Sequence, residues 1–121
     1  MKVSQIMNLL GAEVFTCHDL IDKQLHFGFC ADLMSDALAY ATSGTLLITG
    51  LMNMQTLRTA EMLDVECILF VRNKKPTDEI IQSAAEIGII LLSTDKTSYE
   101  SSGILYGAGL PAIDVREVSL T

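Results

Sequence analysis

The chain has 121 residues, of which half are hydrophobic, with a mean hydropathy of +0.38 and a formal net charge of −7. This length fits one domain with a core of its own, and the acidic balance disfavours nucleic acid and anionic membranes as partners. No apolar run approaches the ~20 residues that a membrane-spanning helix needs.

The first part of the chain predicts one helix and two short strands. Apolar residues between positions 3 and 10 follow helical spacing, with Ser4 as the expected N-cap and Gly11 as the expected C-cap. Residues 13–17 and 25–30 predict strands, joined by a polar connection.

Residues 28–41, GFCADLMSDALAYA, predict a helix with two aspartates one turn apart. We expect Asp32 to be its N-cap, with its carboxylate accepting from the first amides of the helix. Asp36 and Tyr40 would continue a polar stripe from Asp32, either as a solvated surface or as the rim of a pocket or subunit contact. The expected apolar face, on the other side, consists of Met34, Ala37, Leu38 and Ala41.

From residue 45 onward, predicted strands and helices alternate at short and even intervals. The strands are expected at 45–49, 67–71 and 89–92, and the helices at 53–63, 77–87 and 96–106. This alternation predicts a single α/β domain over residues 1–121, with a mostly parallel open sheet and helices on both faces. The last residues, 110–121, predict an edge strand or an arm onto a neighbouring subunit.

The loops after the strands are the expected ligand site, because open α/β sheets bind ligands at the carboxyl ends of their strands. Basic side chains in these loops and the amides of helix N-termini suit a phosphate or a carboxylate. The candidate ligand-binding residues are Thr49, Gly50, Asn53, Arg72, Asn73, Lys75, Ser93, Thr94 and Lys96. Lys74 adds a further charge. The alternative is that the charged loops only keep the surface soluble.

Sequence motifs for catalysis and for cofactors are missing. No G-x-x-x-x-G-K-[ST] loop is present. Cys17, His18, His26 and Cys30 could complete a zinc tetrahedron, but they lack the paired spacing of a structural zinc site. We therefore expect no metal, no cofactor and no catalytic residue.

Location and assembly are inferred from composition. The N-terminus lacks the charged segment and apolar run of a secretory signal. Three cysteines, the third being Cys67, are an odd count and too few for a disulfide-stapled fold. We expect reduced thiols, a cytoplasmic protein and a homo-oligomer, dimer or higher, because so apolar a small chain must hide surface.

Taken together, these segments resemble the DRTGG domain family, which accompanies some phosphotransacetylases and is similar in outline to the N-terminal domain of HPr kinase/phosphorylase. The resemblance runs over most of the chain, through MKVSQIMNLLGAEV, FGFCADLMSDALAYA, LLITG, CILFVRNKKPTDEIIQSAAEIGIILLSTD and TSYESSGILYGAG. The GFCADLMSDALAYA segment is most similar to small stand-alone bacterial and archaeal members. Some of these occur in clostridial-type anaerobes alongside iron hydrogenase genes.

The residues that name the family are replaced in this chain. Where Asp-Arg should follow Thr49-Gly50, it has Leu51-Met52, and Val71-Arg72-Asn73 stands where Thr-Gly-Gly should end the next strand. A ligand role built on those motif residues therefore does not carry over. The resemblance implies a regulatory or ligand-sensing α/β module that self-associates, with a protein partner in anaerobic or hydrogenase-related metabolism.

Three functional hypotheses follow. The first is a non-catalytic regulatory module that binds a small anionic metabolite, phosphate- or nucleotide-like, and acts through self-association or a partner. The second is a purely structural, homo-oligomeric assembly protein. The third is a small enzyme that uses Asp32 and Asp36, with His18 and Tyr40, as acid–base groups. The resemblance favours a site or interface role for the two aspartates.

Overall fold

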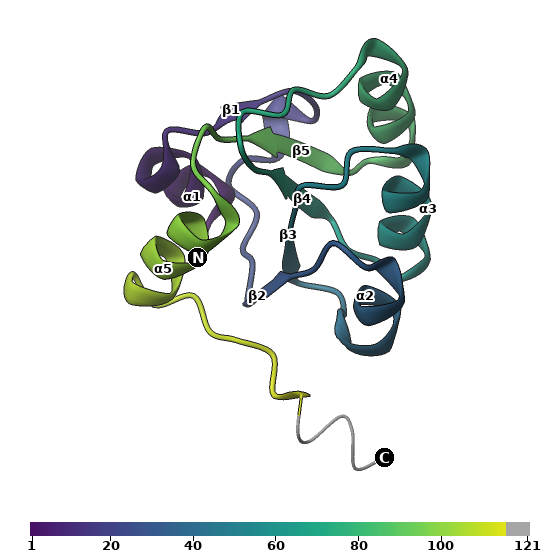
Figure 1. Cartoon of the computed structure of the whole chain (residues 1–121). Helices are drawn as coiled ribbons and strands as arrows, with labels where there is room; N and C mark the ends of the chain where they lie inside the picture. Colours follow the sequence, from purple (N-terminus) through teal and green to yellow (C-terminus); the bar gives the residue numbers. More distant parts are fainter. Residues whose placement is uncertain (116–121) are drawn as a thin grey trace.

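Five strands form one sheet in the order β1-β5-β4-β3-β2, shown in Figure 1 for a computed structural model that describes residues 1–115. The strands are β1 (Glu13–Val14), β2 (Phe27–Cys30), β3 (Thr45–Thr49), β4 (Cys67–Phe70) and β5 (Ile90–Ser93). β2, β3, β4 and β5 are parallel to one another, and β1 pairs antiparallel with β5. The mostly parallel α/β sheet expected from the sequence is confirmed.

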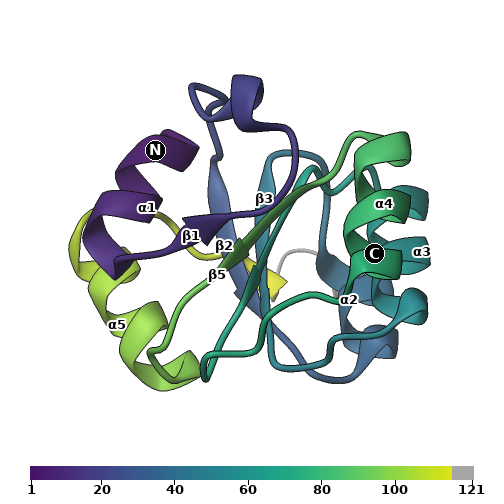
Figure 2. The ribbon, with the colours of Figure 1, turned by 90° about the horizontal axis from the view of Figure 1, so that it is seen from above.

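Two layers of helices cover the sheet. The helices are α1 (Val3–Leu10), α2 (Met34–Tyr40), α3 (Met54–Met62), α4 (Asp78–Ile87) and α5 (Ser98–Gly107), and His18–Leu20 form a 3-10 turn. Figure 2 shows α2, α3 and α4 on one face, with α1 and α5 on the other. Right-handed crossovers explain the first layer, because the strands from β2 to β5 are added in one direction. After β5 the chain turns to the opposite face.

The core is divided by the sheet into two apolar layers. Leu46 and Ile48 of β3 pack toward α1 and α5, whereas Leu47 between them packs toward α2, α3 and α4. β4 repeats the pattern, with Leu69 on the first side and Ile68 on the second. Strands buried on both faces are continuously apolar, which is why these segments could be predicted from sequence.

The N-terminal helix begins two residues earlier than expected. Lys2, not Ser4, occupies the N-cap position, and the Lys2 amide donates to Gln5 Oε1 at 2.8 Å. The side chain of Gln5 therefore pairs with the amide of the N-cap residue itself, and the N-cap side chain does not cap the first turn as Ser4 was expected to. Gly11 is the C-cap, with a left-handed φ of 60°.

β1 is shorter than the strand expected at residues 13–17, because the Thr16 side chain replaces the backbone in hydrogen bonding to the β5 segment. β1 ends at Val14, and the buried hydroxyl of Thr16 then donates to the Ile89 carbonyl at 2.7 Å and accepts from the Leu91 amide at 2.9 Å. Cys17 follows with a left-handed φ of 53°. The hydroxyl thus continues the contact with the β5 segment beyond the end of the ladder.

Two predictions for the segment after β2 are wrong. Leu33 is the N-cap residue of α2, so Asp32 lies outside the helix and does not cap it. Leu38 is 47% exposed, while Met34, Ala37 and Ala41 are buried as expected. The helix is only seven residues long, so its buried stripe is narrower than the sequence pattern predicted.

The expected edge strand at 110–121 begins as a single bridge. Ala112 pairs in parallel with Gly28, whose amide donates to the Pro111 carbonyl at 2.9 Å. The rest of that prediction, from residue 116 onward, lies outside the described residues. Within residues 1–115, no helix is long and apolar enough to cross a membrane.

Candidate functional site

The carboxyl ends of β2 and β3 are joined by one carboxylate. Asp32 Oδ1 accepts a hydrogen bond from the Gly50 amide at 2.9 Å and another from the Thr49 hydroxyl at 3.0 Å. The Thr49 hydroxyl also accepts from the Leu51 amide at 3.1 Å. Two of the predicted site residues, Thr49 and Gly50, are therefore brought together by an aspartate that was expected to act in a helix.

The same contacts set the charge state of Asp32. The Gly50 amide lowers the pKa of this carboxyl below its usual range, although partial burial opposes the effect. The Thr49 hydroxyl and the positive charges of Arg72 and Lys74 lower the pKa further. Asp32 is consequently a carboxylate at neutral pH, and basic residues from the loop after β4 lie near it.

Arg72 lies against the backbone of Gly50. A Cβ built on Gly50 would be 2.2 Å from Arg72 Nη2, so the guanidinium occupies the space that any other residue at position 50 would fill. The chain has glycine there for this close approach. Arg72 is exposed to solvent at the same time, which leaves its charge accessible.

The loop after β4 has a specific backbone shape. Arg72 and Asn73 both adopt left-handed conformations, with φ of 58° and 59°. Their amides donate to the carbonyls of Lys96 and Thr94, both at 2.8 Å. The loop after β4 is therefore fastened to the loop after β5, and the Asn73 side chain is exposed at the same edge.

Two predicted ligand-binding hydroxyls are engaged within the fold. Ser93 Oγ donates to the Lys74 carbonyl at 2.7 Å, and Thr94 Oγ1 donates to the Leu10 carbonyl at 2.9 Å. Both residues are buried. They shape the loops, and the structure does not place their side chains at the exposed edge beside Arg72.

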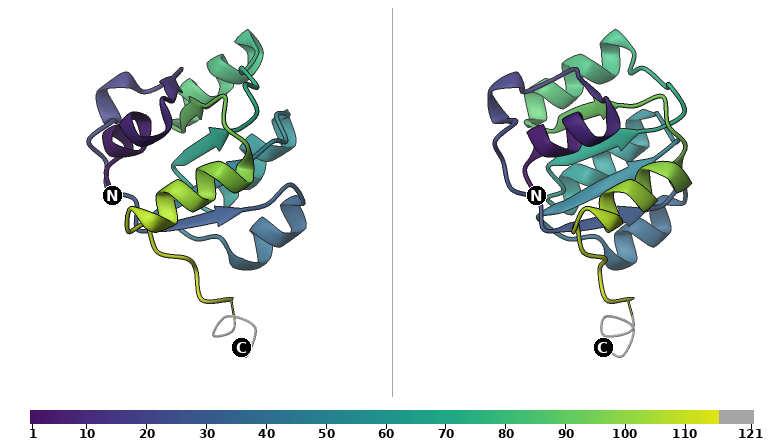
Figure 3. Two further views of the ribbon diagram at one scale, coloured as in Figure 1. Left: turned by 60° about the vertical axis from the view of Figure 1, so that its left-hand side comes forward. Right: turned by 90° about the vertical axis from the view of Figure 1, so that its left-hand side faces the viewer.

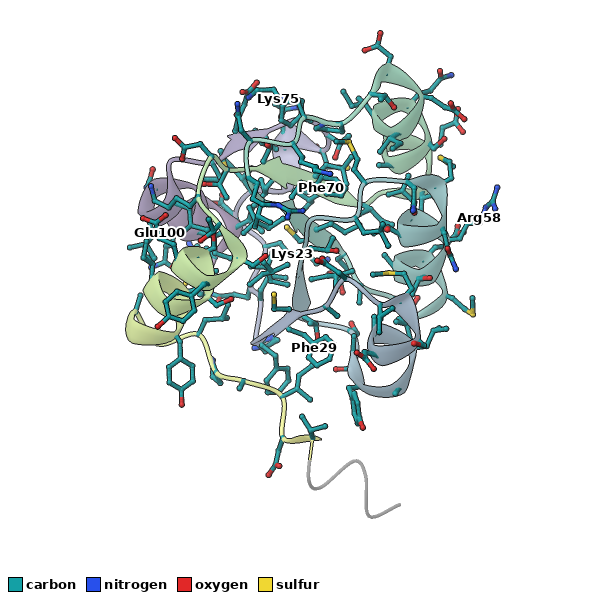
Figure 4. The ribbon with its side chains drawn as sticks, viewed as in Figure 1. Lys23, Phe29, Arg58, Phe70, Lys75 and Glu100 are labelled. Carbon is teal, nitrogen blue, oxygen red and sulfur yellow. The ribbon has the colours of Figure 1, made fainter. Side chains whose placement is uncertain are left out.

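The remaining predicted site residues are spread along the edge. Asn53 caps α3, because its Oδ1 accepts from the Thr56 amide at 3.0 Å. Lys75 Nζ is 3.2 Å from Glu13 and 5.7 Å from the centre of the Phe15 ring, which draws it to the β1 side, as Figure 4 shows. Lys96 Nζ is 3.9 Å from the adjacent Asp95.

The acidic stripe predicted for the second helix is divided. Asp36 lies in the first turn of α2, whereas Asp32 lies before the helix at the end of β2. The Tyr40 ring packs near Phe29, with a centroid distance of 6.1 Å. Because Asp32 lies before the helix, the three residues do not form one stripe on a helix face, and the role predicted for Asp32, Asp36 and Tyr40 at a pocket rim or subunit contact stays a prediction.

Sequence reasoning missed a cavity of about 260 Å³ on the α5 face of the sheet. It is bounded by β2, by α5 and by the segment that follows α5, with Cys30, Ser102 and Tyr106 among its lining residues. The available signal was Gly28, since glycine inside a strand marks a close approach of another part of the chain. Leu110 makes that approach, 3.2 Å from a Cβ built on Gly28.

The metal constellation considered from sequence is not assembled. Among residues 1–115, no group of three or more His, Cys, Asp and Glu side chains could hold a metal ion. His26 precedes β2, whereas Cys30 is the last residue of that strand.

Comparison with known proteins identifies the domain. The solved regulatory region of a Clostridium perfringens pyrophosphatase, comprising CBS and DRTGG domains in complex with the activator diadenosine tetraphosphate, is similar in fold, with a TM-score of 0.71 at 17% identity. The match covers 98% of this chain and 58% of that one, so this chain spans under two thirds of its neighbour. The search of curated proteins gave no match. The family model for the DRTGG domain matches residues 5–108, and the chain therefore belongs to the DRTGG domain family.

Proposed function

We propose that this protein is a regulatory module that binds a small phosphate-bearing metabolite, nucleotide-like, at the carboxyl edge of its sheet. The observation that carries the proposal is the arrangement of Arg72 against Gly50. An exposed guanidinium beside the Gly50 backbone offers paired donors to a phosphate. The structural neighbour supports a nucleotide, since that regulatory region is complexed with diadenosine tetraphosphate.

The N-terminus of α3 is the best-placed helix end for an anion. The first turn of α3 carries no acidic residue, whereas α4 has Asp78 and Glu79 there and α5 has Glu100. An anion is attracted by the positive end of a helix and repelled by carboxylates at that end. α3 also begins just after Gly50, so the amides of its first turn and the Arg72 side chain lie on the same side of the β3–α3 turn.

Asp32 has a positioning role in this proposal. Its carboxylate fixes the Gly50 amide and attracts Arg72 and Lys74 toward the β3–α3 turn. One negative charge beside two positive ones leaves a local excess of positive charge next to Gly50, in a chain whose net charge is −7. This local charge would orient an anionic ligand on an otherwise repelling surface.

The same observations weaken the hypothesis of a small enzyme. A general base acts best with a pKa near the working pH, and the pKa of Asp32 is shifted down, away from neutrality. Its Oδ1 already accepts two hydrogen bonds. Asp36 belongs to α2 and is not part of this arrangement.

The structural assembly hypothesis is supported by exposed apolar side chains. Leu33 is 66% exposed, Leu38 is 47% exposed and Met62 is 70% exposed. A second copy of the chain or a protein partner could cover them. This role is compatible with ligand binding, since a regulatory module has to pass its signal to another surface.

Native mass spectrometry on gently purified protein distinguishes the ligand-sensing hypothesis from the structural assembly hypothesis. A multimer of the 13.2 kDa chain that retains extra mass of nucleotide size supports the sensing module. A multimer without added mass, even with ATP supplied, favours pure assembly. As a second readout, ATP at a hundred times its Kd should add about 2.7 kcal/mol of stability in thermal unfolding.

A further inference from the structure

The cavity on the α5 face has walls suited to a flat apolar group. Its volume is about 260 Å³, below the ~300–1,000 Å³ that holds a whole drug-sized ligand. Ile48 of β3 and Leu105 of α5 are apolar and buried, and both line the cavity, as do Gly28 of β2 and Leu110. A single ring system fits this space, and a complete nucleotide does not.

The position of the cavity follows from the course of the chain after α5. Figure 3 shows α5 lying across the sheet and the chain then passing β2 before it leads away from the sheet. Leu110 packs over Gly28, and the Pro111 carbonyl accepts from the Gly28 amide at 2.9 Å. The cavity is therefore closed on one side by a segment that is hydrogen-bonded to the edge of the sheet.

Main-chain polar groups of β2 point to the free edge of the sheet. In a strand the N–H and C=O groups alternate in direction, and the Ala31 amide bonds inward to the Ile48 carbonyl of β3 at 3.1 Å. Gly28 points outward to Pro111, so Cys30, two residues further, also directs its N–H and C=O outward. One donor and one acceptor thus lie side by side at the free edge of β2, on Cys30, which is one of the residues that line the cavity, as are Ser102 and Tyr106.

We propose that this cavity binds the adenine base of the nucleotide, a proposal that rests on the proposed function. The amino group and the neighbouring ring nitrogen of adenine match an adjacent main-chain acceptor and donor, while its faces suit the apolar walls. An aliphatic occupant would leave these polar groups unpaired. β2 and β4 are two strand spacings apart, roughly 10 Å, and Arg72 lies three residues beyond Leu69, which is level with Cys30 across the sheet, so the span from Cys30 to Arg72 is roughly 14 Å. A nucleoside triphosphate and the Arg72 side chain together can cover this span.

Adenosine, which has no phosphate, tests the base site alone by calorimetric titration. We expect adenosine to bind the wild-type chain, and to bind at least tenfold more weakly to Ser102→Phe, in which the ring fills the cavity. Tyr99→Ala is the matched control, because Tyr99 is on the same helix, is 90% exposed and is not among the cavity-lining residues. No adenosine binding by the wild type, or equal binding by Ser102→Phe, overturns the proposal.

A second measurement tests the base site in the wild-type protein, without a variant that fills the cavity. Cys30 is exposed and lines the cavity, whereas Cys17 is partly buried elsewhere. Saturating adenosine should slow alkylation of Cys30 by N-ethylmaleimide at least fivefold, with Cys17 unchanged, as read by peptide mass spectrometry. Unchanged labelling of Cys30 contradicts the base site.

Tripolyphosphate separates this proposal from the one on which it rests. If tripolyphosphate binds the wild type and not Arg72→Ala while adenosine fails to bind, the phosphate site holds and the base site is wrong. If adenosine binds and tripolyphosphate does not, the phosphate site is wrong.

Discussion

The Gly50 amide donates a hydrogen bond of 2.9 Å to Asp32 Oδ1, so the residue that follows β3 holds the carboxylate that follows β2. Through this contact the ends of two neighbouring strands form one unit, and Arg72 packs on its Gly50 side. The first predictions concern this unit.

Replacing Asp32 should cost more stability than replacing Asp36. Asp32→Ala removes the acceptor of two hydrogen bonds and leaves the Gly50 amide unsatisfied, at a cost of about 1–2 kcal/mol. Asp36→Ala, at an exposed position in the first turn of α2, should stay within about 0.5 kcal/mol. Urea unfolding of both variants measures the difference. Equal losses would contradict the assigned role of Asp32.

The Asp32 contacts should also appear in the pH dependence of stability. Because its folded-state pKa lies below the unfolded value of 3.8, its contribution is present above that pH and is lost as the pH falls through the folded-state pKa. The difference in unfolding free energy between wild type and Asp32→Asn should therefore shrink below about pH 4. A constant difference from pH 7 to pH 2 would contradict this.

Gly50→Ala should affect anion binding more than folding. The added Cβ would displace only the end of the flexible Arg72 side chain, so we expect a stability loss below about 1 kcal/mol. Anion affinity should fall with the displaced guanidinium. Gly103→Ala is the control, since a Cβ there meets nothing within 4 Å and should stabilise α5 by about 0.5–1 kcal/mol. Unchanged ATP affinity in Gly50→Ala would contradict the site.

Leucines on the α2, α3 and α4 layer should differ sharply in their importance. Leu57→Ala, at a fully buried position, should cost about 2–5 kcal/mol, whereas Leu38→Ala, at a half-exposed position, should cost less than about 1 kcal/mol. Denaturant unfolding midpoints provide the comparison. A large loss for Leu38→Ala that depends on protein concentration would instead place this side chain in a contact between copies.

The cysteines should react in order of their exposure. Burial raises the pKa of the Cys67 thiol, with a smaller contribution from Cys17, so Cys67 is neither a thiolate nor accessible at neutral pH. We expect N-ethylmaleimide to modify Cys30 in the native protein and Cys67 only after unfolding. Rapid native-state modification of Cys67 would show that the sheet opens locally.

The sequence pattern was sufficient for the fold because the strands between residues 45 and 93 are apolar on both faces and are separated by capped helices. α4 is capped by Thr77 and Gly88, so it lies within one residue of the helix predicted at 77–87. The sequence pattern gave the wrong role where a residue far along the chain forms the hydrogen bond of the side chain. Asp32 follows the pattern of an N-cap, but the Gly50 amide, 18 residues away, takes its carboxylate. In the same way, the hydroxyls of Ser93 and Thr94, predicted to bind a ligand, donate to the carbonyls of Lys74 and Leu10.

The basic loop illustrates the same limit for the candidate site. Arg72 and Lys75 are close in sequence, yet Arg72 packs on Gly50 while Lys75 pairs with Glu13 on the β1 side. Spacing along the chain placed both at one edge of the sheet, but which of them can meet a ligand beside Asp32 depends on backbone conformation. Arg72 and Asn73 adopt that conformation with left-handed φ angles. Because the loop contains no glycine, its sequence did not predict a left-handed backbone.

The most direct test of the central claim is a calorimetric titration of ATP into the wild-type protein, Arg72→Ala and Arg58→Ala. Arg58 is the matched control, because it is an exposed arginine on α3 that points away from the sheet (Figure 4). We predict saturable binding of ATP by the wild type and by Arg58→Ala, and at least tenfold weaker binding by Arg72→Ala. ATP binding of equal strength in all three proteins, or in none of them, would contradict a phosphate-binding regulatory site at this edge of the sheet.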